Sequence, residues 1–145
     1  MKWIVLRIKG IMLTAGVLTS TMLYAAVAPR AALQSTFGEQ LNGPVAEIVV
    51  RNWGALIGLI GAMLLYGAYR PSNRSLVLTV AGLSKVVFIG LVLSQGARYL
   101  GHQAGIAVVI DSIFVLLFAG SLGIALIYMG FLYDKAAKQP PDGVS

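Results

Sequence analysis

Four long stretches with almost no charged side chains are the feature that most constrains this chain. Residues 10–29, 52–69 and 112–133 contain no Asp, Glu, Lys or Arg, and residues 75–97 contain only Lys85. A helix needs about 20 apolar residues to cross the hydrocarbon core of a bilayer, which is about 30 Å thick. Helices also satisfy their own backbone hydrogen bonds, for which hydrocarbon offers no partners. The sequence therefore predicts four transmembrane helices.

The composition excludes several classes of protein. Of the 145 residues, 58% are hydrophobic and 11% are charged, whereas soluble domains carry about 25% charged residues. This argues against a soluble enzyme, a nucleic-acid-binding protein and a disordered chain. The absence of Cys excludes disulfides and zinc–thiolate sites. A single His with few acidic residues gives poor spacing for a metal site, and no catalytic motif is present, so we expect neither metal nor cofactor.

The expected fold is an all-α, integral membrane four-helix bundle formed by residues 1–134. The connection 29–43 is expected to be a loop that ends in a turn before Pro44, which suits the first position of a helix. The polar tail, residues 135–145, is expected to be disordered. The predicted helices span about residues 8–28, 44–69, 75–99 and 106–133.

The start of the chain has two interpretations. Three basic residues precede an apolar stretch that ends in Ala26-Val27-Ala28, as in a cleaved signal peptide. Because Pro29 would directly follow the cut, we expect the stretch to be retained as the first transmembrane helix.

The distribution of lysine and arginine predicts the orientation. Seven cations lie on the side that holds both termini: Lys2, Arg7, Lys9, Arg70, Arg74, Lys135 and Lys138. The other side holds three, which two acidic residues partly offset: Arg30, Arg51 and Arg98, with Glu39 and Glu47. Since cytoplasmic loops carry the excess of basic residues, we expect both termini in the cytoplasm of a bacterium, with the chain in its inner membrane. The net charge of +6 then indicates attraction to anionic lipids and not to nucleic acid.

Five ionisable residues fall inside or at the edges of the expected helices: Glu47, Arg51, Lys85, Arg98 and Asp111. Each costs about +2.5 to +3.5 kcal/mol at a helix centre, so such residues face the bundle interior and pair. Arg51 lies about 10 Å and Asp111 about 9 Å into their helices. We therefore predict an Arg51–Asp111 pair and, nearer the helix ends, a Glu47–Arg98 pair. Such pairs either fix the helix register or belong to a functional site.

Lys85 has no acidic residue at its own expected depth. It lies about 15 Å from the start of its helix, and Asp111 is expected about 10 Å nearer the outer surface, roughly twice the distance that a lysine stem covers. Three possibilities stay open. Lys85 reaches toward Asp111, loses its charge through desolvation, or binds an anionic or carbonyl-bearing ligand.

The polar and small residues share helix faces. The face of helix 44–69 that carries Glu47 and Arg51 also carries Gly54-x-x-x-Gly58, which lets another helix approach closely, within the chain or in a homo-oligomer. In helix 75–99, Gln95 shares a face with Ser84 and Arg98. Trp53 is expected at the membrane interface, and His102 in a loop. Each helix then contributes a polar or small face to the interior.

Five features together resemble small, uncharacterised bacterial four-helix membrane proteins of the broad DoxX-like kind. They are Ala28-Pro29, Val50-Arg51-Asn52-Trp53-Gly54, Gly67-x-x-Arg70-Pro71, Ser84-Lys85 and Asp111. Proteins of this kind include accessory subunits of quinone-linked oxidoreductases. The resemblance implies a four-helix inner-membrane bundle and directs attention to Arg51, Asn52, Lys85 and Asp111.

Three functions are consistent with the sequence. The favoured one is a module that binds a lipophilic ligand such as a quinone, or that docks on a larger membrane complex or a second copy of itself, while contacting membrane lipids. Its ligand-binding candidates are Arg51, Asn52, Trp53, Lys85, Gln95, Arg98 and Asp111. An alternative is an enzyme of the isomerase, cyclase or epoxide hydrolase type, acting on a lipophilic molecule with Asp111 or Glu47 as acid or base and Arg51 or Lys85 stabilising negative charge. The third is a small proton-coupled transporter that uses Asp111.

Overall fold

The computed structural model describes residues 2–137, and every regular element in this range is a helix. The elements are α1 (Lys2–Ser20), α2 (Leu23–Val27), α3 (Pro29–Phe37), α4 (Pro44–Tyr69), the short 3-10 helix η1 (Pro71–Asn73), α5 (Arg74–Ser94) and α6 (Gln103–Ala137). Four helical stretches are long and apolar enough to cross a membrane: Arg7–Val27, Pro44–Tyr69, Pro71–Ser94 and Gln103–Lys135. The predictions of an all-helical fold and of four such stretches are confirmed.

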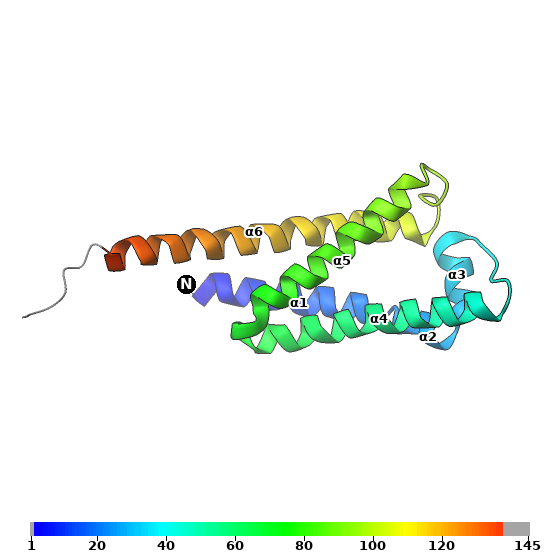
Figure 1. Cartoon of the computed structure of the whole chain (residues 1–145), viewed down its shortest axis with the longest axis horizontal. Coiled ribbons are helices and arrows are strands. Elements are labelled where there is room, and N and C mark those ends of the chain that lie inside the picture. Colours follow the sequence, from blue (N-terminus) through cyan, green and yellow to red (C-terminus); the bar gives the residue numbers. More distant parts are fainter. Residues whose placement is uncertain (1, 138–145) are drawn as a thin grey trace, which may run out of the picture.

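The helices form two pairs that run along a common long axis (Figure 1). In one pair α1 and α2 lie beside α4, and in the other α5 lies beside α6. Figure 1 shows α3 and the turn between α5 and α6 at one end of the bundle, here called the α3 end. The start of α1, η1 and the end of α6 lie toward the opposite end, here called the terminal end. The main apolar core joins the two pairs and includes the fully buried Met12, Leu64 and Phe118.

Glycines on one face of α4 bring this helix into close contact with α1 and α2. A Cβ atom at Gly54 would lie 2.6 Å from the backbone nitrogen of Ala26, and one at Gly61 would lie 2.7 Å from that of Ser20. Both distances are too short for a side chain, so the two backbones approach as only glycine permits. The predicted packing face of this helix is confirmed, and its partner lies within the same chain.

The first of these four stretches is broken, and the connection after it is not a simple loop. Thr21 lies between α1 and α2, where its hydroxyl donates a 2.6 Å hydrogen bond to the carbonyl oxygen of Leu18. Local hydroxyl bonds of this kind compete with regular helix geometry. The expected loop 29–43 contains α3, which begins with Pro29 and ends at Phe37, just before Gly38, whose φ of 71° stops the helix. A left-handed glycine is a common helix end.

The ends of α5 and α6 differ from the expected ones. α5 ends at Ser94 instead of residue 99, and Gly96 just beyond it has a φ of 66°, which takes the chain out of the helix. α6 begins at Gln103, three residues earlier than expected, and continues to Ala137. Residues 135–137 are therefore helical where disorder was expected, and residues 138–145 lie outside the described range. These shifts change which residues of α5 and α6 share a depth.

The close contact at Gly54 predicts a stability difference between two glycine variants. Gly54→Ala should lower the free energy of unfolding by about 1–3 kcal/mol, because the added methyl group overpacks the contact with α2. Gly90→Ala is the matched control, since a Cβ atom there meets nothing within 4 Å, and it should raise stability by about 0.5–1 kcal/mol. Chemical unfolding in detergent micelles measures both. Equal effects of the two substitutions would contradict the packing described here.

Candidate functional site

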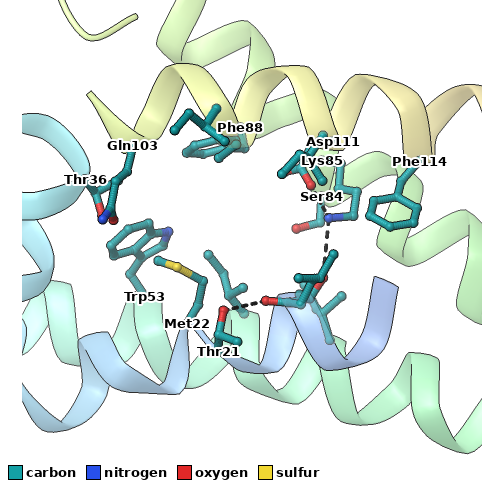
Figure 2. Close-up of a pocket in the computed structure, with 17 residues that line it drawn as sticks. Thr21, Met22, Thr36, Trp53, Ser84, Lys85, Phe88, Gln103, Asp111 and Phe114 are labelled. Atoms are coloured by element: carbon teal, nitrogen blue, oxygen red, sulfur yellow. Dashed lines mark hydrogen bonds and ion pairs between the residues drawn. The ribbon is translucent and has the colours of Figure 1, made fainter. Parts of the chain in front are cut away.

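A cavity of about 380 Å³ lies between the two helix pairs, and we call it the inter-pair cavity (Figure 2). Most of its wall is apolar, with aliphatic side chains from α1, α4 and α6 and aromatic rings from α4, α5 and α6. The lining residues are Leu18, Thr19, Thr21, Met22, Thr36, Trp53, Ile57, Ile60, Ser84, Lys85, Phe88, Gln103, Ile106, Ala107, Ile110, Asp111 and Phe114. Its volume falls within the range of about 300–1,000 Å³ that is usual for small-molecule sites.

A buried ion pair forms part of the cavity wall. The Nζ atom of Lys85 on α5 contacts the Oδ1 atom of Asp111 on α6, and it also donates a 3.4 Å hydrogen bond to the hydroxyl of Thr19 on α1. The side chains of Lys85 and Asp111 are only 8% and 18% exposed. The ring of Phe114 lies 5.6 Å from Nζ and covers the amine on another side. Three helices therefore meet at this one amine.

The Lys85–Asp111 contact is the first of the three possibilities left open for this lysine, and the observed helix ends explain it. Because α5 ends at Ser94, Lys85 lies nine residues, or about 13.5 Å, from the α3 end of its helix. Because α6 begins at Gln103, Asp111 lies eight residues, or about 12 Å, into its helix. The two depths match, so the lysine stem has no large gap to cover.

The prediction that Arg51 pairs with Asp111 is wrong. Arg51 contacts Glu47, one turn earlier on the same helix, at 2.8 Å. It also donates a 2.7 Å hydrogen bond to the carbonyl oxygen of Ala26 at the end of α2. Carbonyl groups at the end of a helix lack helical partners, and α2 ends beside α4, so Arg51 satisfies them directly. Neither Arg51 nor Glu47 lines the inter-pair cavity.

The predicted Glu47–Arg98 pair is also wrong. Arg98 contacts Glu39, in the connection that follows α3, with 2.6 Å between Nη2 and Oε1. Glu47 is instead occupied by Arg51 and, at 3.7 Å, by Arg30. The early end of α5 places Arg98 in the turn before α6, where it faces the connection after α3. The Arg98–Glu39 and Glu47–Arg51 pairs both involve partly exposed side chains and lie outside the inter-pair cavity.

The remaining candidate ligand-binding residues are distributed between the cavity and other surfaces. Trp53, which was expected at the membrane interface, lines the inter-pair cavity. Gln95 lines a smaller hollow of about 190 Å³, which also has Trp53, Phe88 and Tyr99 in its wall. Asn52 is exposed and lines neither space. Of all the candidates, the structure brings together Trp53, Lys85 and Asp111.

Several polar residues of the cavity wall were missed by the sequence reasoning. Thr36 on α3 is 93% buried, since its exposed fraction is 7%, and its hydroxyl makes no hydrogen bond within the described residues. Ser84 and Gln103 also line the cavity without such a bond. Figure 2 shows Thr36, Gln103 and Trp53 toward one end and Lys85 and Asp111 toward the other. The helical spacing placed Ser84 on the polar face of helix 75–99, so the sequence held a signal for it. Thr36 belongs to a segment that was expected to be a loop, so no helix face was assigned to it.

The chemistry of this arrangement suits an uncharged molecule. The two ionisable residues of the wall neutralise one another, so neither is free to balance a charged guest. Within the described residues, no group of three or more His, Cys, Asp or Glu side chains is arranged to hold a metal ion.

No protein-family model, curated protein or solved structure matches this chain. The site must therefore be interpreted from its own geometry.

The buried ion pair predicts an asymmetric response to mutation. Asp111→Asn should lower the free energy of unfolding by about 3–5 kcal/mol, because it leaves the Lys85 ammonium buried without a counter-charge. The double variant Lys85→Met with Asp111→Leu should recover most of that loss, since apolar side chains need no partner there. Chemical unfolding in detergent micelles measures these effects.

The matched control for this prediction is the exposed ion pair. Glu39→Gln removes the carboxylate that contacts Arg98 at the α3 end, and it should cost less than about 1 kcal/mol. If Asp111→Asn is no more destabilising than Glu39→Gln, Lys85 is not held as described.

Proposed function

We propose that this chain is a multi-pass protein of the bacterial inner membrane with both termini in the cytoplasm. Two observations support this orientation. The cations of the terminal end include Arg7, Lys9, Arg70 and Arg74. The arginines of the α3 end are matched by Glu39 and Glu47 through the contacts described above. An excess of basic residues on one side is typical of the cytoplasmic face.

The orientation predicts which turns a membrane-impermeant reagent reaches. Ser72 in η1 and Gly101 in the turn before α6 are both exposed, and the native chain contains no Cys. In intact bacterial cells, an impermeant maleimide should label Gly101→Cys, and it should label Ser72→Cys only after permeabilisation. The native chain serves as the unlabelled control. Labelling of Ser72→Cys alone in intact cells would reverse the proposed orientation.

We propose that the protein binds an uncharged, lipophilic small molecule in the inter-pair cavity. The observation that carries this proposal is a mostly apolar space of about 380 Å³ whose two charged residues are already paired. A charged guest would lose its hydration without gaining a free counter-ion, which is costly. An apolar guest would displace water from apolar walls, which is favourable.

Hydrogen-bonding groups in the cavity wall narrow the class of ligand. Two of the three N–H groups of Lys85 are directed to Asp111 and Thr19, so one donor is left for a guest. At the other end, Trp53 can only donate, while the Thr36 hydroxyl has no partner in the described part of the chain. A ligand with oxygen acceptors on an apolar body fits both ends. A quinone, with two carbonyl oxygens on an apolar ring, is one molecule of this class.

A second candidate function is an enzyme that acts on the same kind of molecule. The observation that favours it is the presence of both Lys85 and Asp111 in one cavity wall. A lysine–carboxylate pair can transfer a proton to or from a bound molecule, with Asp111 as the base and Lys85 stabilising negative charge on a carbonyl oxygen. The resemblance to DoxX-like membrane proteins is compatible with both functions and stays a prediction.

Tryptophan fluorescence tests the binding proposal. The chain has two tryptophans, Trp3 and Trp53, so the Trp3→Phe variant reports on the cavity wall alone. A bromine-terminated fatty alcohol, which is uncharged and carries one hydroxyl, should quench Trp53 in a saturable way, and the unbrominated alcohol should reverse the quenching. Thr36→Val in this background should weaken binding about fivefold, because it removes one hydrogen bond worth about 1 kcal/mol.

The matched control for Thr36→Val is Thr14→Val. Thr14 is an exposed threonine of α1 outside the cavity wall, so its replacement should leave the affinity unchanged. Quenching that rises linearly without saturation, or an equal effect of the two threonine variants, would contradict binding in the inter-pair cavity.

A further inference from the structure

The exposed residues of the cavity wall all come from one side of the bundle. Five of the 17 lining residues are exposed to the surroundings, and the others are buried or partly buried. The exposed ones lie on α1, at the break between α1 and α2, or on α6: Leu18, Thr21, Gln103, Ile106 and Ile110. We call these five residues the lateral mouth. The wall residues of α4 and α5 are not exposed, so the cavity opens between α1 and α6.

The packing of the helices explains why the opening lies there. Toward the terminal end, Met12 and Ala15 of α1 belong to the same buried core as Phe114 and Phe118 of α6. Beyond Phe114 toward the α3 end, the facing residues of the two helices, Leu18 and Ile110, are exposed. α1 packs mainly on α4, and α6 packs mainly on α5. α1 and α6 therefore touch near the terminal end and leave a gap beside the cavity.

The aliphatic residues of the lateral mouth lie within helical stretches that are long and apolar enough to cross a membrane. Leu18 is nine residues, or about 13.5 Å, from the α3 end of the stretch Arg7–Val27. Ile106 and Ile110 lie about 4.5 Å and 10.5 Å into α6. Their side chains are 45%, 64% and 37% exposed, as is expected for aliphatic groups that face acyl chains and not water.

Aromatic contacts lie at the α3 end of the cavity. The rings of Phe37 and Trp53 lie with their centroids 6.0 Å apart, and those of Phe37 and Tyr99 lie 5.4 Å apart. These aromatic contacts connect α3, α4 and the turn before α6. Thr36, next to Phe37, is 93% buried at this end of the cavity. A molecule that enters between α3 and α4 would have to separate the rings of Phe37 and Trp53, whereas one that enters between α1 and α6 meets the exposed aliphatic residues of the lateral mouth.

We propose that the inter-pair cavity takes its ligand sideways from the membrane leaflet on the α3 side, through the lateral mouth between α1 and α6. The ligand is thus a membrane-dissolved amphiphile and not a water-soluble molecule. It moves between Leu18 and Ile106 into the cavity, where its oxygen meets the hydroxyl of Thr36 or the amine of Lys85. This inference rests on the proposed binding function and adds the route and the source of the ligand.

The rate of Trp53 quenching tests the route. The full chain carrying Trp3→Phe is placed in phospholipid vesicles and mixed rapidly with the bromine-terminated fatty alcohol. Leu18→Phe with Ile106→Phe narrows the lateral mouth and should slow both binding and release about tenfold. Leu18→Ala with Ile106→Ala widens the mouth and should speed both steps. The second variant keeps the test decisive if the larger side chains disturb folding.

The matched control carries the same enlargement on exposed residues outside the cavity wall. Leu59→Phe with Val109→Phe changes one residue of α4 and one of α6, both 61% exposed, and should leave the rates unchanged. Rates that respond equally in the mouth and control variants would overturn the lateral route. A changed dissociation constant with an unchanged binding rate would also overturn it, since it would show contact without passage. Loss of saturable quenching in the parent chain would instead overturn the binding function itself.

Discussion

The buried ion pair between Lys85 and Asp111 is the interaction on which the rest of this structure depends. Both side chains are largely buried, so neither charge is stable alone, and each needs a partner at its own depth. Their contact fixes the register of α5 against α6, and the hydrogen bond to Thr19 extends it to α1. The same pair forms a neutralised wall of the inter-pair cavity. This one contact therefore joins three helices of the bundle and leaves the cavity wall without an unpaired charge.

The packing of α4 complements this contact. Glycines hold α4 tightly against α1 and α2, whereas α5 and α6 form a separate pair that meets the first chiefly around Phe118 and Leu64. A tight pair and a second pair joined to it at the terminal end leave space toward the α3 end. The cavity is therefore a consequence of where small and large side chains lie along the helices. Arg51 adds to the contact between α2 and α4 by donating a hydrogen bond to the carbonyl oxygen of Ala26.

The sequence was sufficient to predict four helices that are long and apolar enough to cross a membrane, because length and hydropathy can be read from the residues themselves. It failed at the helix ends, because hydropathy continues past Ser94 while the backbone leaves the helix near Gly96. An error of five residues moves a side chain by about 7.5 Å along the axis, which is enough to assign Asp111 to Arg51 in place of Lys85. Thr36 was missed because residues 29–43 were expected to be a loop, although Pro29, Ala32 and Thr36 lie at helical spacing and share the buried face of α3.

Photo-crosslinking tests most directly whether the hollow between the helix pairs holds a membrane-dissolved molecule. A fatty alcohol bearing a diazirine is activated in vesicles that contain the native chain, and peptide mass spectrometry locates the adducts. We expect adducts on half-buried wall residues such as Trp53 and Ser84, and an excess of ordinary fatty alcohol should suppress them. Adducts confined to outward side chains such as Leu59 and Leu116, and insensitive to that excess, would contradict the account.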